Sequence, residues 1–183
     1  MQIEPLKLAG TYSVTLAPIS DERGYFVTTY LESAFHAQGI EAHWVQENQS
    51  LSRRKGVLRG LHFQAPPHAQ AKLVRVLSGV VLDVWVDIRK DSPTYGQWDS
   101  IELDAQRHSM VYIAQGFAHA FLTLTEDTIV LYKVDSPYAP QSEGGLLWND
   151  PILAIPWPLD EPQLSQRDQR WPTLAEFDSP FYR

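Results

Sequence analysis

The stretch GVLRGLHFQ at residues 56–64 places a histidine, His62, inside an apolar run that is typical of a β-strand. Arg59 precedes this histidine by three residues, and Gln64 follows it by two. An imidazole has an ordinary pKa of about 6.5 and exchanges protons near neutral pH, so His62 could act as a base. It could also bind a metal ion or be a hydrogen-bonded core residue. The rest of the chain must separate these three roles.

The metal-binding role is weakened by the residues around His62. The spacing resembles the metal motif of cupin β-barrels, in which a His-x-His pair, a glutamate and a later histidine bind the ion. His62 and His119 fit this pattern, but Gln64 replaces the second histidine and Lys72 lies where the glutamate would fall. An ammonium about 4 Å from a unit positive charge costs about 4 kcal/mol at an effective dielectric of 20. We therefore expect no metal ion, and the histidines and the lysine favour an anion or a developing oxyanion.

Short strand-like runs, separated by Gly, Pro, Asp and Ser, recur along the chain and indicate an all-β sandwich or barrel. The expected strands cover residues 11–19, 24–30, 71–88, 98–103, 109–114, 120–125 and 128–134. The longest of these runs is expected to form two strands that meet at Ser78-Gly79. Within 80–88 the residues alternate, so that Leu82, Val84, Val86 and Ile88 share one face of the strand.

One helix is expected at residues 31–39, where Leu31 and Phe35 are spaced i,i+4 and Gly39 is a plausible C-terminal stop. The segment 149–162 is too rich in proline for regular structure and is expected to wrap around the barrel. Residues 165–168 could open a short helix, because Ser165-x-x-Asp168 fits a capping box.

Composition restricts the class of protein. The 183 residues fit one domain, 1–183, with a sizeable core. The formal net charge of −7 argues against a nucleic-acid surface, and the absence of cysteine excludes disulfides, zinc–cysteine sites and cysteine nucleophiles. No run of about 18 apolar residues predicts a membrane span, and the N-terminus lacks an export signal, so we expect a cytoplasmic location. The one dense basic cluster, Arg53-Arg54-Lys55, is interpreted as a solvated turn.

Eight segments, in order along the chain, closely resemble the dTDP-4-dehydrorhamnose 3,5-epimerase family: DERGYF (21–26), VQENQS (45–50), GVLRGLHFQ (56–64), AKLVRVLSG (71–79), LDVWVDIR (82–89), GFAHAF (116–121), YKVDSPYAP (132–140) and GGLLWNDP (144–151). The resemblance implies a cupin-type jelly-roll barrel or sandwich with a few short helices and an irregular C-terminal wrap. It also implies a homodimer, for which strand exchange is plausible because exposed sheet edges tend to be covered. The implied activity needs no cofactor and inverts C3 and C5 of dTDP-4-keto-6-deoxyglucose.

The resemblance assigns four catalytic roles. His62 matches the family's base, Tyr132 its general acid, and Lys72 the cation near the C4 oxygen. Asp168 matches the aspartate that orients the histidine and stabilises its protonated form. From the sequence alone, Asp168 could instead cap a helix, and Asp83 is a rival partner for His62 that could equally orient His119.

Further positions match residues that bind the nucleotide or the sugar: Arg23, Phe26, Gln46, Asn48, Arg59, His119, Tyr138, Glu143 and Arg167. Among them, Tyr138 corresponds to an aromatic that stacks on thymine, and arginine forks suit a diphosphate. Strict alternation would place Arg59 and His62 on opposite faces of one strand. Either a bulge near Gly60 turns the chain, or Arg59 reaches another part of the ligand, for example across the dimer.

Some positions depart from the family pattern. Thr28 stands where a glutamate is frequent, Arg167 where a lysine usually precedes the aspartate, and Ala120 where GFAHGF has a glycine. Because of these departures, an alternative function remains: an epimerase that inverts only C3 or only C5 of a related dTDP-4-keto-deoxysugar. Rhamnose synthesis and natural-product synthesis would both fit. Alternatives of other classes are a metal-dependent cupin and a cupin that binds sugar nucleotides without catalysis.

Overall fold

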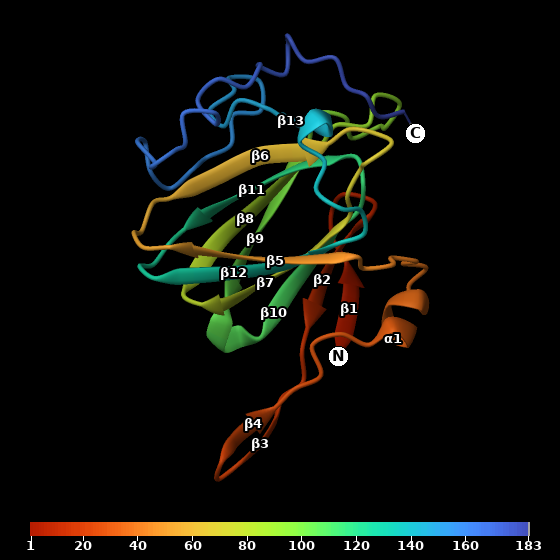
Figure 1. The fold of residues 1–183 in the computed structure, drawn as a ribbon, viewed down its shortest axis with the longest axis vertical. Coiled ribbons are helices and arrows are strands. Elements are labelled where there is room, and N and C mark those ends of the chain that lie inside the picture. The colour runs from red at the N-terminus through yellow and green to blue at the C-terminus, as the bar shows by residue number, and fades with distance from the viewer. Residues whose placement is uncertain (183) are drawn as a thin grey trace.

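The computed structural model describes residues 1–182, which form two antiparallel β-sheets that face each other and a hairpin that projects from them (Figure 1). The six-stranded sheet has the order β1 (Gln2–Pro5), β2 (Thr11–Thr15), β10 (Ser109–Ile113), β7 (Lys72–Ser78), β12 (Thr128–Val134) and β5 (Gln46–Ser52). The five-stranded sheet has the order β13 (Glu143–Gly145), β6 (Leu58–Gln64), β11 (Phe117–Thr123), β8 (Val80–Asp87) and β9 (Trp98–Asp104). The hairpin consists of β3 (Ile19–Asp21) and β4 (Gly24–Phe26). The expected all-β sandwich is confirmed.

The space between the two sheets is filled by inward-facing residues that alternate along each strand. Val74 and Val76 of β7 meet Trp85 of β8 and Phe121 of β11 in one buried cluster. Lys72 lies two residues before Val74, so period two turns it toward the same interior. The strands therefore carry a polar group into the sandwich near one end of an otherwise apolar core.

The outer face of the five-stranded sheet is covered by the C-terminal segment, drawn in blue in Figure 1. Val86 and Ile88 of the β8 region pack with Leu153 and Phe181, and all four are buried. The expected wrap is confirmed, and it explains why the residues on the outer face of β8 are apolar and buried. The wrap also brings residues 165–168 beside β6.

The helix and the first two expected strands are shorter than the sequence pattern indicated. The helix α1 spans only Glu32–His36, and a turn ends at Gly39, whose φ is +73°. The expected strand at 11–19 ends at Thr15, and the one at 24–30 ends at Phe26, because the β3–β4 hairpin leaves the sheet and pairs only with itself. No helix within residues 1–182 is long and apolar enough to cross a membrane.

Residues 166–169 form a turn, and no helix opens at 165–168. Ser165 Oγ accepts a hydrogen bond from the Asp168 N–H at 3.1 Å, which is one half of a capping box. The Asp168 carboxylate does not complete the box, because it binds a side chain of β6 instead. Two further short elements are the 3₁₀ turns η1 (Ala105–Arg107) and η2 (Pro140–Ser142).

A bulge in β6 shifts its register against β11. His62 pairs with His119, whereas Arg59 pairs with Phe121, so three residues of β6 span two residues of β11. Gly60 lies at this point with φ +130°, and a Cβ there would stand 2.4 Å from the Ala120 Cβ. The bulge therefore requires glycine at position 60 and turns Arg59 to the same side of the sheet as His62.

Candidate active site

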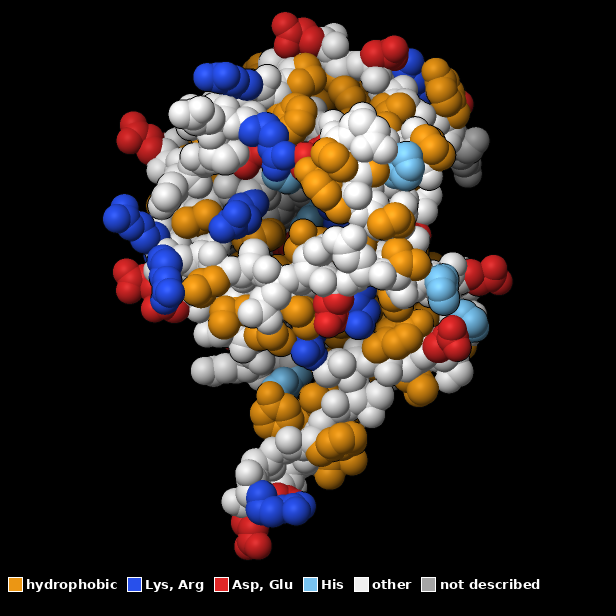
Figure 2. Space-filling model, in the orientation of Figure 1, with side chains coloured by type: hydrophobic (Ala, Val, Ile, Leu, Met, Phe, Trp, Pro, Cys, Tyr) orange, Lys and Arg blue, Asp and Glu red, His pale blue; other side chains and the backbone are white. Residues whose placement is uncertain are grey.

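A cavity of about 350 Å³ lies between the two sheets, and a hollow of about 290 Å³ adjoins it and shares several of its lining residues. Figure 2 shows an opening below the C-terminal segment, with basic side chains beside it. Of the predicted catalytic and binding residues, all but Arg23 and Phe26 line one of the two spaces. The six-stranded sheet supplies Lys72 and Tyr132, the five-stranded sheet supplies Arg59, His62 and His119, and the C-terminal turn supplies Arg167 and Asp168.

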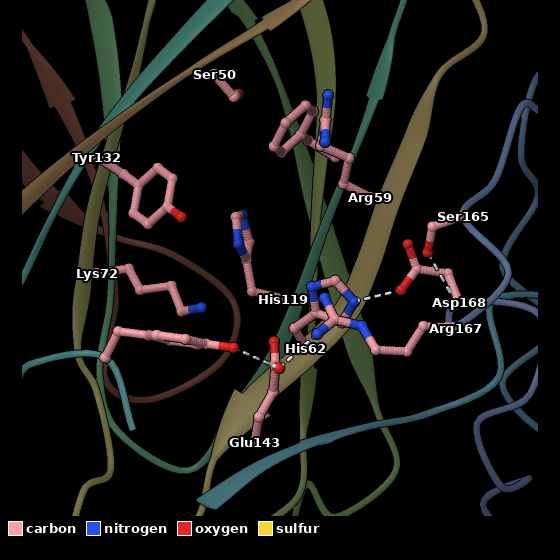
Figure 3. A pocket seen from close by; sticks show the side chains of 12 residues that line it. Ser50, Arg59, His62, Lys72, His119, Tyr132, Glu143, Ser165, Arg167 and Asp168 are labelled. Atoms are coloured by element: carbon pink, nitrogen blue, oxygen red, sulfur yellow. Dashed lines mark hydrogen bonds and ion pairs between the residues drawn. The ribbon is translucent and has the colours of Figure 1, made fainter. Parts of the chain in front are cut away.

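His62 is joined to Asp168 by a hydrogen bond of 2.5 Å between Nε2 and Oδ1. Burial tends to raise the pKa of the Asp168 carboxyl, but hydrogen bonds from His62, Ser165 and Trp171 outweigh it and leave the pKa below its ordinary value. Asp168 is therefore ionised at neutral pH and can stabilise an imidazolium. Because Nε2 is engaged, Nδ1 is the ring nitrogen left to accept a proton, and the ring stands between Asp168 and the cavity (Figure 3).

The other wall of the cavity carries a phenol and an ammonium group. Tyr132 on β12 and Lys72 on β7 point into the cavity from the side opposite His62 (Figure 3). Burial raises the pKa of the Tyr132 hydroxyl, and the nearby Arg59 guanidinium offsets only part of this effect. Tyr132 thus remains protonated at neutral pH and is able to donate a proton.

The ammonium group of Lys72 is buried in the cavity wall and has a lowered pKa. Burial lowers its pKa to about 8, although the carboxylates of Asp83 and Glu143 oppose this change. The amine is still mostly protonated at neutral pH, yet the charge is held in an environment that disfavours it. Such an ammonium group can stabilise a negative charge that develops on a bound molecule.

The two rival aspartates have different partners. Asp168 binds His62, whereas Asp83 accepts a hydrogen bond from His119 Nε2 at 2.8 Å. Asp83 is fully buried, and its Oδ2 has no hydrogen-bond partner among the described residues. The contacts therefore pair Asp83 with His119, the second of the two partners considered for it from the sequence.

A chain of hydrogen bonds crosses the rim of the cavity. Glu143 Oε2 accepts hydrogen bonds from the Tyr138 hydroxyl at 3.0 Å and from Arg167 at 2.5 Å. Gln46 accepts from the Tyr138 N–H at 3.0 Å and donates to Asn48 at 2.7 Å. All five were predicted binding residues, and these contacts bring them together along one edge of the cavity.

Arg23 and Phe26 lie outside this cavity, on the projecting β3–β4 hairpin (Figure 1). Phe26 is 71% exposed, and Arg23 is bound to Asp21 of the same hairpin. The structure therefore does not bring these two residues to the site of their own chain.

Besides Ser165, which was considered only as a helix cap, the sequence analysis missed two residues that line the cavity, Ser50 and Phe121. The Ser50 hydroxyl is buried without a hydrogen-bond partner among the described residues. A signal was present in both cases, because Ser50 follows Gln46 and Asn48 by period two on β5, and Phe121 follows His119 on β11. Extending the alternation of the predicted binding residues would have found them.

A family model, a curated relative and two solved structures all relate this chain to epimerases that act on dTDP-sugars. Residues 5–176 match the family described as dTDP-4-dehydrorhamnose 3,5-epimerase. A protein of that name from Salmonella typhimurium is 48% identical over 158 residues, which cover 85% of this chain and 86% of that protein. The structure of a dTDP-6-deoxy-D-glucose-3,5-epimerase from Legionella pneumophila, in complex with dTDP-4-keto-L-rhamnose, superposes with a TM-score of 0.94 at 38% identity and covers 100% of this chain and 98% of that one. A 3'-monoepimerase from Streptomyces bikiniensis, in complex with dTDP-quinovose, superposes with a TM-score of 0.88 at 39% identity and covers 94% of this chain and 87% of that one.

Proposed function

This chain belongs to the dTDP-4-dehydrorhamnose 3,5-epimerase family, and we propose that it inverts C3 and C5 of dTDP-4-dehydro-6-deoxy-D-glucose to give dTDP-4-dehydro-L-rhamnose. The cupin-type jelly-roll fold expected from the sequence is confirmed by the two facing sheets and by the likeness to solved epimerases. The roles of individual residues are part of the proposal.

One observation supports the reaction most strongly. His62, bound to Asp168, stands on one wall of the cavity, and Tyr132 stands on the opposite wall. Epimerisation requires that a proton leaves one face of a carbon and another arrives on the opposite face. A base and an acid on facing walls meet that requirement without any movement of the protein backbone.

The proton transfers balance as follows. His62 Nδ1 takes the proton from the carbon next to the ketone, the C–H electrons form a carbon–carbon double bond, and the carbonyl electrons move to the C4 oxygen. Lys72 donates a hydrogen bond to this enolate oxygen and stabilises its charge. The Tyr132 hydroxyl then gives a proton to the opposite face of the carbon, and the ketone forms again. Exchange with solvent restores neutral His62 and protonated Tyr132.

We propose further that the protein acts as a homodimer in which the β3–β4 hairpin reaches the site of a second copy. The support is the exposure of Ile19 and Phe26, at 74% and 71%, on a hairpin that packs little against its own chain. In a second copy, Arg23 would bring its guanidinium to the diphosphate of the substrate. Size-exclusion chromatography with light scattering tests this assembly, and a monomeric enzyme with full activity would contradict it.

The reaction is tested by turnover in deuterium oxide with NMR analysis of the product. The proposal predicts deuterium at both C3 and C5, because both protons are lost to the enzyme and replaced from solvent. Deuterium at C3 alone would assign the chain to the 3-epimerases, and deuterium at C5 alone to the 5-epimerases.

A further inference from the structure

The turn at residues 135–142 joins β12 to β13 and carries Tyr138, the proposed contact of the nucleotide base. Glutamine side chains hold four successive residues of this turn. Gln70 donates to the Ser136 carbonyl at 2.7 Å, and Gln46 accepts from the Tyr138 N–H at 3.0 Å. Gln64 donates to the Pro137 carbonyl at 3.2 Å and accepts from the Ala139 N–H at 2.8 Å, so it binds the turn on both sides of Tyr138.

Gln64 has no amide hydrogen left to donate to a ligand, and its amide oxygen already accepts a hydrogen bond from the backbone. Its side chain is buried, with the whole residue 4% exposed, and its amide nitrogen also donates to the His68 carbonyl at 2.7 Å. Both amide hydrogens and the amide oxygen are thus engaged by backbone groups. The residue at the position of a cupin metal ligand therefore binds the backbone of a neighbouring turn.

Tyr138 depends on this support because little else fixes it. The residue is 54% exposed, so core packing does not determine its orientation. Its hydroxyl is bound to Glu143, which lies just beyond the same turn. The position of the aromatic ring is thus set mainly by the backbone of residues 136–139, which the glutamines hold.

We propose that Gln64 is a positioning residue for nucleotide recognition, which holds the 135–142 turn so that Tyr138 is oriented before the ligand arrives. This inference rests on the proposed function, because it takes Tyr138 as the contact of the base. Preorganisation of an exposed aromatic lowers the entropy lost on binding, so loss of Gln64 should weaken binding while the proton transfers proceed.

The test is the affinity for dTDP, measured by isothermal titration calorimetry on the full chain. Gln64→Met keeps the size of the side chain and removes its three hydrogen bonds, and we expect the dissociation constant to rise about tenfold. With the sugar nucleotide as substrate, KM should rise by a similar factor while kcat changes by less than about twofold. Gln49→Met, on the exposed face of β5, is the matched control and should leave both values unchanged.

A double-mutant cycle with Tyr138→Ala separates positioning from general stability. If Gln64 acts through Tyr138, Gln64→Met should cost little further affinity in the Tyr138→Ala background. Equal losses in both backgrounds would overturn the proposal, because they would show a role independent of Tyr138. Thermal unfolding of each variant identifies any that do not fold, and Gln70→Met, which removes one bond to the same turn, then replaces Gln64→Met in the cycle.

The outcomes also distinguish this proposal from the proposed function. If Tyr138→Ala weakens dTDP binding but Gln64→Met and Gln70→Met do not, the positioning role is wrong and the nucleotide site stands. If Tyr138→Ala itself binds dTDP with unchanged affinity, the proposed role of Tyr138 fails, and the role of Gln64 fails with it.

Discussion

His62 and Asp168 are 106 residues apart in the chain, yet their Nε2 and Oδ1 atoms lie 2.5 Å apart. The contact exists because the C-terminal wrap covers the outer face of the five-stranded sheet. It places the turn that contains Asp168 beside β6. It leaves Nδ1 of the imidazole for the substrate and gives the protonated ring a buried countercharge. The proposed base and its activation thus depend on the same long-range packing.

Replacement of Asp168 by asparagine should lower kcat by about 10²–10⁴, because the imidazolium that forms during the reaction loses its countercharge. Steady-state kinetics of Asp168→Asn provide the measurement. Asp160→Asn, an exposed aspartate of the same C-terminal segment, is the control and should be fully active. Near wild-type kcat in Asp168→Asn would show that the pair is structural only.

Replacement of Tyr132 by phenylalanine should impair the completion of epimerisation at C5 more than deuterium exchange at C3. Exchange at C3 needs only the base, His62, whereas epimerisation is completed only when the Tyr132 hydroxyl, which burial keeps protonated by raising its pKa, donates a proton to the opposite face. Time-resolved NMR of Tyr132→Phe in deuterium oxide follows both positions separately. An equal loss at C3 and C5 would count against this assignment.

The activity of the free enzyme should fall as the pH rises through about 8, the value to which burial lowers the pKa of Lys72. Above that pH the amine loses its proton and no longer stabilises the enolate, so kcat/KM should decrease about tenfold per pH unit. A pH profile of kcat/KM tests this expectation. A plateau that continues to pH 10 would contradict the role of the ammonium.

The same pKa makes a prediction about stability, with the sign fixed by linkage. A lowered pKa means that the folded state disfavours the charged amine, so the folded protein loses its proton before the unfolded chain does. The free energy of unfolding should therefore rise between pH 8 and 10, and Lys72→Met should unfold at a higher temperature than the wild type at pH 7. Lys7→Met, at an exposed lysine, should not change the unfolding temperature.

Substitution of Gly60 by alanine should reduce both stability and activity. The new Cβ would stand 2.4 Å from the Ala120 Cβ and 2.6 Å from the His119 carbonyl oxygen, at a φ that alanine rarely adopts. We expect a loss on the order of 3 kcal/mol in the free energy of unfolding, measured with urea. Gly39→Ala is the control, because it has a φ of +73° but nothing within 4 Å, so it should cost only about 1 kcal/mol. Equal losses would show that steric contact at the bulge is unimportant.

The sequence predicted what depends on local periodicity and missed what depends on distant packing. The alternation of residues 128–134 gave the bounds of β12 and placed Tyr132 correctly, since one face of that strand is buried. The sequence left undecided whether Arg59 lies on the same side of the sheet as His62. The extra residue in β6 that decides this is visible only in its pairing with β11. Asp168 carried a local capping signal, and only the fold decides that its carboxylate binds His62.

The pattern of apolar residues predicts strands at 11–19 and 24–30, which include both ends of the hairpin at 19–26. In the structure these residues are exposed, and no strand of the described chain pairs with β3 and β4 apart from each other. These apolar side chains are not buried by their own chain, and the sequence pattern does not distinguish them from side chains that are. The same feature is the basis of the proposed dimer.

The base assignment is tested most directly by proton exchange in His62→Ala, incubated with dTDP-4-dehydro-6-deoxy-D-glucose in deuterium oxide and followed by NMR. We expect exchange at both C3 and C5 to slow by about 10²–10⁴, because a single imidazole serves both carbons. His43→Ala, at an exposed histidine, should exchange at the wild-type rate, and equal unfolding temperatures would show that both variants are folded. Exchange at both carbons at a near wild-type rate in folded His62→Ala would contradict the account.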